Sequence, residues 1–240
     1  MFPSLRSALY LVIFHTLILG VAAQAAPVAG WGANVPHLSG QSTVRGEIVF
    51  FITHATSDFD REMSIKENVN KRIADAENSA IPVLYLVDDD SASSLKNYYL
   101  VYRPNFLLLS GGGEHSVHTS AKQLIFAGGF WDTCAEETIR DAILLNDNQG
   151  GPTRANLLTD SLYNGSAYTL KDAIRPLGDD ATIEYLRHTF FFDGRFAGLQ
   201  DQMTFEIFRD GRKIGEFGQG PRNVEINFVI DATISDLISK

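Results

Sequence analysis

Residues 48–52, Ile-Val-Phe-Phe-Ile, form the apolar stretch that decides the fold. A short apolar run without alternation is typical of a strand buried on both faces, as the strands of a parallel sheet are. A second run, Ile-Pro-Val-Leu-Tyr-Leu-Val, follows at residues 81–87. Between the two runs, apolar residues recur at helical spacing: Ile65, Val69, Ile73 and Ala76. Strand, helix and strand in this order predict a parallel βαβ unit.

The same alternation continues along the chain. Residues 106–109 and 124–127 are two more short apolar runs, and Gly128-Gly129 ends the second one. A helix is expected next, because one stripe holds Ala135, Thr138, Ile139, Ala142 and Ile143. We therefore predict an α/β core over residues 46–150, a doubly wound and mostly parallel sheet covered by helices on both faces.

Residues 151–240 have a different pattern. Residues 156–187 look helical in pieces, broken at 164–165 and at 176–178, whereas residues 189–230 look like strands. Asp210-Gly211 between two of these strands favours a tight hairpin turn. We expect a C-terminal α+β extension that contains a β-hairpin, or else a small second domain.

The net charge and the cysteine content exclude several classes of partner and cofactor. The 240 residues include 20 Lys and Arg against 29 Asp and Glu, a formal net charge of -9. Nucleic acid and anionic membranes are therefore disfavoured as partners. The single cysteine excludes an internal disulfide, and it excludes a four-thiolate zinc site or an iron-sulfur cluster held by one chain. We expect no cofactor, and homo-oligomerisation is left open.

The N-terminus predicts export. Arg6 is followed by a mostly apolar run over residues 8–23, and Ala23-Gln24-Ala25 offers small residues at the positions that a signal peptidase reads. We interpret residues 1–25 as a cleaved signal peptide, with an irregular lead-in over residues 26–45 and a periplasmic or secreted mature protein that does not bind membranes. The alternative is an uncleaved anchor, although the run is shorter than the ~20 residues of a spanning helix.

Cys134 lies where chemistry is expected, just beyond a buried strand and two glycines. Thr133 and Glu136 have the spacing of a capping box, which predicts Thr133 as the N-cap and Cys134 as the first helical residue. The positive end of a helix dipole would favour the reactive thiolate there, whereas the nearby glutamates oppose it. The alternative is a cysteine packed as a small apolar side chain.

These residues resemble a known family. A glycine six residues before the cysteine, followed by Cys-x-x-x-Thr-x-x-Asp-Ala, matches Gly128, Cys134, Thr138, Asp141 and Ala142. Over roughly residues 46–146 the chain is similar to the isochorismatase-like cysteine hydrolases. The resemblance implies a cysteine nucleophile, a general base and a lysine at the C-terminal edge of the sheet, acting on a small-molecule substrate.

The departures from the family pattern decide the candidate residues. The family's Asp-x-Gln-x-Asp-Phe corresponds to residues 54–59, so that His54 stands in place of the first aspartate and Asp58 matches the second. A histidine can accept a thiol proton, as in other cysteine-histidine pairs. No lysine aligns; Arg103 or Lys96 lies nearest. His54 could equally be a structural side chain at a strand end.

The candidate site therefore has two kinds of residue. We take Cys134 and His54 as the catalytic candidates. Arg103, Trp131 and Asp58 are the substrate-binding candidates; Trp131 replaces a family threonine and is expected to fill part of the pocket.

Three functions stay open at this point. The first is an exported cysteine hydrolase acting on a small amide or acyl substrate. The second is a non-catalytic module on the same fold that binds a small molecule or a protein. The third, less favoured, is a metal-dependent protein using His115 and His118, which follow a glycine-rich loop. The acidic run at residues 88–90 suits solvated loop charge better than a cation site.

Overall fold

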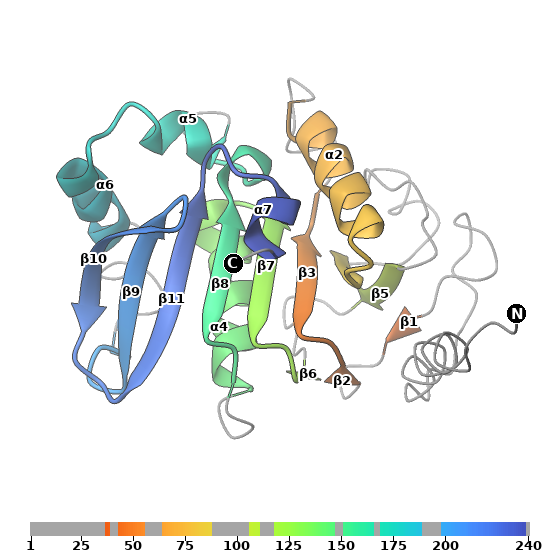
Figure 1. Cartoon of the computed structure of the whole chain (residues 1–240), viewed down its shortest axis with the longest axis horizontal. Coiled ribbons are helices and arrows are strands. Elements are labelled where there is room, and N and C mark those ends of the chain that lie inside the picture. The colour runs from red at the N-terminus through yellow and green to blue at the C-terminus, as the bar shows by residue number, and fades with distance from the viewer. Residues whose placement is uncertain are drawn as a thin grey trace, which may run out of the picture.

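The computed structural model describes residues 37–38, 43–55, 64–87, 106–110, 118–146, 151–165, 169–188 and 198–238. Its centre is a nine-stranded sheet in the order β1-β5-β4-β3-β7-β8-β11-β9-β10 (Figure 1). The strands are β1 His37–Leu38, β3 Ile48–Thr53, β4 Val83–Val87, β5 Phe106–Ser110, β7 Gln123–Gly128, β8 Arg154–Leu158, β9 Met203–Arg209, β10 Arg212–Gly218 and β11 Arg222–Val229. All neighbours in this sheet are parallel except β9 and β10.

The strand order reverses between β3 and β7. From β3 the chain continues through β4 to β5 on one side, and from β7 it continues to β8 on the other. The two strands are paired in parallel, with Thr53 opposite Gly128 at their carboxyl ends. This arrangement is the topological switch point of a doubly wound sheet, where ligands of such folds generally bind.

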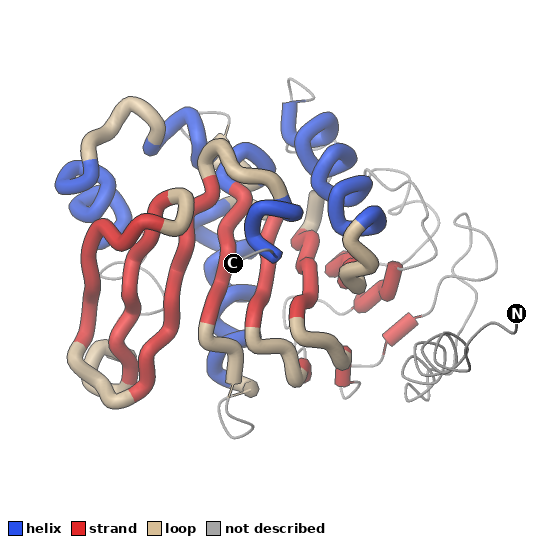
Figure 2. Tube along the Cα trace, viewed as in Figure 1, coloured by secondary structure: helices blue, strands red, loops and turns tan. Residues whose placement is uncertain are grey.

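Helices cover both faces of the sheet (Figure 2). Helices α2 (Ser64–Asn78) and α7 (Ile234–Ile238) pack on one face, and α4 (Glu136–Leu144) packs on the other. Alternate side chains of β3 point to opposite faces of the sheet. Phe50 and Ile52 pack in the apolar cluster under α2, whereas Val49 and Phe51 pack in the cluster under α4. The apolar run at residues 48–52 is needed because both sides of this strand are buried.

The fold prediction is confirmed in its main features. The sheet is mostly parallel and doubly wound, and the βαβ unit of β3, α2 and β4 is present. The hairpin of β9 and β10 turns at Asp210 and Gly211, both with positive φ (49° and 79°). Helices α5 (Leu170–Ile174) and α6 (Asp179–Leu186) are separated at the expected break at residues 176–178.

One stretch expected to begin a helical region is a strand instead. Residues 156–158 belong to β8, which lies between β7 and β11 and is parallel to both. Asn and Leu have no strong strand preference, so the backbone pairing offered by two neighbouring strands decides the conformation. The extension thus continues the same sheet, with β11 lying between β8 and β9.

The parts of the chain that the structure describes include no helix that is both long and apolar enough to cross a membrane.

Candidate functional site

His54 lies at the switch point, directly after β3. Its side chain is 7% exposed, and its backbone N–H donates to the carbonyl oxygen of Leu86 on the neighbouring β4 (3.1 Å). Its φ of +42° is unusual for a residue that has a Cβ atom. Such strained backbone conformations persist only where the surrounding structure holds them in place, and they are concentrated at functional sites.

Gly128 and Gly129, at the end of β7, let this strand approach the end of β3 closely. Both have positive φ, 71° and 67°. A Cβ atom on Gly128 would collide with the carbonyl oxygen of Thr53, and one on Gly129 would lie 3.3 Å from the Thr53 Cγ2 atom and from the Ala135 nitrogen. The two glycines therefore let the end of β3 and the start of the following helix approach each other closely.

Cys134 lies in a wide π-type turn, η1 (Trp131–Ala135), and α4 follows from Glu136. The Thr133 N-cap prediction is wrong: Phe130 is the N-cap, with no side-chain cap, and Thr133 lies inside the turn. An additional residue in this turn places the helix start earlier than a capping-box pattern indicates. Single π turns are frequent at functional sites.

Cys134 as a residue is partly exposed, and the Thr133 hydroxyl donates to its sulfur at 3.9 Å. This degree of exposure differs from that of a cysteine packed wholly inside a core. We therefore expect an alkylating reagent to reach the sulfur in the folded protein.

A buried hydroxyl pair joins the Cys134 turn to β3. Thr53 donates to the hydroxyl oxygen of Thr138 (3.3 Å), and Thr138 donates to the carbonyl oxygen of Cys134 (2.9 Å). Thr53 precedes His54 directly. The two catalytic candidates therefore belong to backbone segments that one hydrogen-bonded chain connects.

Tyr163 holds the other side of the turn. Its N–H donates to the Gly129 carbonyl oxygen, and its carbonyl oxygen accepts from the Trp131 N–H, both at 3.0 Å. The rings of Phe130 and Tyr163 also pack together, with centroids 5.6 Å apart. Tyr163 thus fixes the backbone on both sides of Phe130.

Of the three predicted substrate-binding residues, the structure describes one. Trp131 is 1% exposed, and its ring meets Phe228 edge-on with centroids 5.6 Å apart. It belongs to the core on the α4 side, and a contact with substrate stays a prediction. Asp58 and Arg103 lie outside the described residues, as do Lys96 and the acidic run at 88–90.

The residues of the metal hypothesis are placed only in part. His118 begins the two-residue strand β6 (His118–Thr119), which pairs with β2 (Thr43–Val44) at the foot of the sheet, opposite the carboxyl ends of β3 and β7 (Figure 1). His115 lies outside the described residues. In the described ranges, no three or more His, Cys, Asp or Glu side chains gather in a way that could hold a metal ion.

Two residues of this site are not found from the sequence, and the burial of a third is not foreseen. Thr53 and Tyr163 were not singled out, although Thr53 directly extends the apolar run that predicts β3. Glu136 was expected as a capping residue, but it is 1% exposed and begins α4 two residues after Cys134. A carboxylate is stabilised by the positive end of a helix dipole at that position.

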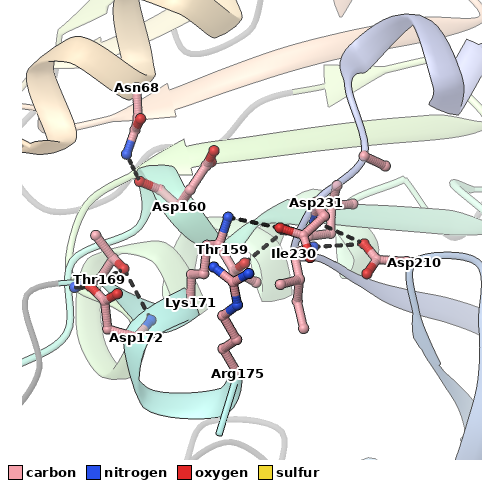
Figure 3. Close-up of polar contacts among 12 residues, drawn as sticks. Asn68, Thr159, Asp160, Thr169, Lys171, Asp172, Arg175, Asp210, Ile230 and Asp231 are labelled. Atoms are coloured by element: carbon pink, nitrogen blue, oxygen red, sulfur yellow. Dashed lines mark hydrogen bonds and ion pairs between the residues drawn. The ribbon is translucent and has the colours of Figure 1, made fainter.

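A second polar network lies along the same edge, at the ends of β8, β9 and β11 (Figure 3). Asn68 of α2 donates to the Asp160 carbonyl oxygen (2.6 Å), and Lys171 of α5 pairs with Asp231 (3.0 Å). The hydrogen bond from Lys171 lowers the pKa of Asp231, and the nearby charges of Arg175 and Arg209 act in the same direction. These groups fasten helices to the sheet edge.

Comparison with known proteins gives weak likenesses. No family model and no curated protein matches the chain. Among solved structures, an isochorismatase family protein is 15% identical over 59% of this chain and 93% of its own, with a TM-score of 0.39. N-carbamoylsarcosine amidase from Thermoplasma acidophilum is 12% identical over 60% and 93%, also with a TM-score of 0.39.

A third likeness is to an isochorismatase family protein from Burkholderia thailandensis, 9% identical over 67% of this chain and 91% of that one, with a TM-score of 0.39. Two of the three therefore carry the name of the family that the sequence resembles. The fold assignment itself rests on the strand order and on the helices that cover both faces of the sheet.

Proposed function

We propose that this chain is an exported hydrolase in which Cys134 attacks a small amide or acyl substrate and His54 accepts the thiol proton. One observation carries the proposal: His54 and the turn of Cys134 follow adjacent parallel strands, β3 and β7, at the switch point of the sheet. The partial exposure of Cys134 and the strained backbone of His54 support it further.

The proposed reaction has two steps. The proton of the Cys134 thiol passes to the imidazole of His54 while the sulfur forms a bond to the substrate carbonyl carbon. The bond to the leaving nitrogen then breaks, and that nitrogen takes the proton from His54. A water molecule next attacks the thioester, gives a proton to His54, and releases the acid as the carbon–sulfur bond breaks. The proton returns to the thiolate.

Alkylation in the native state tests the nucleophile before a substrate is known. We expect iodoacetamide to modify Cys134 at pH 7 in the folded protein, and His54→Ala to lower the rate, because general bases contribute about 10²- to 10⁴-fold to reactions that need them. Cys134→Ala is the control for labelling elsewhere. A screen of small amides and esters follows, with Cys134→Ala as the inactive reference.

The hydrolase proposal would be overturned if Cys134 reacted with iodoacetamide only in urea. If Cys134→Ala also still bound a compound from the screen, the chain would be a binding module. The nearly covered His54, 7% exposed, is the observation that fits that second function. Slow native labelling that is equal in the parent protein and His54→Ala would remove His54 from the mechanism.

Export is proposed from the leader sequence and is tested separately. The protein is expressed with residues 1–25 in a host that has a general secretion system, and the exported fraction is measured by intact mass. The expected product begins at about Ala26. Full-length protein that is retained in the membrane fraction would contradict this part of the proposal.

A further inference from the structure

We infer that Thr53 and Thr138 are positioning residues, whose hydroxyl pair holds the Cys134 turn in register with the strand of His54. The inference rests on the proposed function, since it assigns the pair a role in presenting the thiol. It adds two residues that do not touch the substrate and act through the backbone of Cys134.

The pair lies where the two catalytic candidates are joined. Thr53 is 1% exposed and ends β3, one residue before His54. Thr138 is 4% exposed and lies in the first turn of α4, four residues after Cys134. The hydroxyl of Thr53 donates to that of Thr138 at 3.3 Å, which links segments 85 residues apart in the sequence.

Thr138 uses its hydroxyl in both directions. It donates to the Cys134 carbonyl oxygen at 2.9 Å while it accepts from Thr53. A helical threonine commonly bonds to the carbonyl four residues earlier, and that local bond alone would not relate the helix to the sheet. The bond from Thr53 makes the carbonyl group of Cys134 part of a tertiary contact.

The packing around Thr53 leaves this contact little freedom. Gly129, directly after β7, allows the Thr53 methyl group to lie beside it, because a Cβ atom at Gly129 would be 3.3 Å from both Thr53 Cγ2 and the Ala135 nitrogen. Thr53 therefore presents its methyl group toward the turn that carries Cys134 and its hydroxyl to Thr138. One buried side chain thus lies beside Gly129 with its methyl group and bonds to helix α4 with its hydroxyl.

Native alkylation by iodoacetamide, followed by mass spectrometry, tests the role in the full chain. We expect Thr138→Val and Thr53→Val each to slow labelling of Cys134 by roughly 2- to 10-fold, the equivalent of one ordinary hydrogen bond. Thr138→Ser keeps the hydroxyl and should restore the parent rate. The double variant Thr53→Val/Thr138→Val should be slowed no more than Thr138→Val alone, because that single variant already removes both the bond from Thr53 and the bond to Cys134.

A matched control separates positioning from stability. Thr119 is also 1% exposed and its hydroxyl accepts from the Ala121 N–H, but it lies in the separate two-stranded sheet of β2 and β6. Thr119→Val should lower the urea midpoint without changing the rate of Cys134 labelling. All variants are compared at a urea concentration at which each is folded.

The outcomes distinguish this inference from the proposed function. Native labelling that is fast in the parent and unchanged in Thr138→Val would overturn the positioning role and leave the nucleophile intact. Slowing in Thr138→Val that Thr138→Ser does not restore would show that the hydroxyl group alone does not set the labelling rate, and would also overturn it. A parent thiol that is inert until unfolding would overturn the proposed function and this inference together.

Discussion

The guanidinium group of Arg72 lies 2.8 Å from the carboxylate of Asp160 and joins helix α2 to the end of strand β8. The two side chains are 4% and 16% exposed. Arg72 also donates to the Ala232 carbonyl oxygen, just before α7 (2.9 Å). One side chain therefore connects the two helices of one layer with the strand edge on which the switch point lies.

Removal of one partner of this pair should be costly. We expect Arg72→Met to lower the free energy of unfolding by about 3 to 5 kcal/mol, because Asp160 is left as a largely buried and unpaired charge. Arg72→Met/Asp160→Leu should recover part of the loss. Urea unfolding measures both, with Lys213→Met as an exposed control that changes less. Equal stability of Arg72→Met and the parent protein would contradict the argument.

Gly128 should not tolerate a side chain. Its φ is +71°, and a Cβ atom would collide with the Thr53 carbonyl oxygen. We expect Gly128→Ala to cost at least about 1 kcal/mol of unfolding free energy and to disturb the approach of β3 to the Cys134 turn. Gly165→Ala is the matched control, since nothing lies within 4 Å of its Cβ position. Thermal melting of both variants decides the comparison.

Asn227 should contribute strongly to the stability of the folded protein, although it lies in the C-terminal extension of the sheet. Its side chain donates to the Asn156 side-chain oxygen (2.8 Å) and accepts from the Gly211 N–H (3.0 Å). Asn227→Ala leaves two polar groups without their partner, at about 1 to 3 kcal/mol each where they are buried. The exposed Asn223→Ala on the same strand should have little effect on the urea midpoint. A similar midpoint for both variants would be the contrary result.

The acid pH dependence of stability should report the pairing of Asp231. The hydrogen bond from Lys171 lowers the pKa of this carboxyl below its usual 3.8, slight burial opposes the change, and the Lys171 charge with Arg175 and Arg209 reinforces it. A lowered pKa in the folded state means that the stabilisation is complete above about pH 3.8 and is lost as the pH falls through the folded-state pKa.

Lys171→Gln should therefore raise the pKa of Asp231 and make stability less dependent on pH below that range. Carboxyl NMR titration gives the pKa directly, and urea unfolding at several pH values gives the linkage. Lys213→Gln, which removes a cation from Glu206 and Glu216 instead, is the control. An unchanged Asp231 titration in Lys171→Gln would refute the assignment.

Much of the fold could be predicted because burial dictates the sequence directly. The runs at 48–52 and 81–87 must be apolar on both faces, and Asp210-Gly211 must accommodate positive φ, so each leaves a local signal. Residues 154–158 carry no such signal. Their conformation depends on β7 and β11, which lie up to some 70 residues away in the sequence.

The site was predictable only in outline. The glycines and Cys134 have a recognisable spacing, and strand ends predict where they gather. The extra residue of the π turn cannot be foreseen from capping preferences, because it depends on Tyr163 and on the close approach of β3. The link between Thr53 and Thr138 is a tertiary contact, and neither residue differs in type from an ordinary buried threonine.

The position of β11 between β8 and β9 also sets the order in which the protein can be assembled. During synthesis, the hairpin of β9 and β10 leaves the ribosome before the strand that attaches it to the sheet. Until residues 222–229 follow, the hairpin has no neighbour in the sheet and β8 is an open edge. A nascent chain halted before β11 therefore exposes two pairing edges, and chaperones should hold such chains far longer than the finished protein.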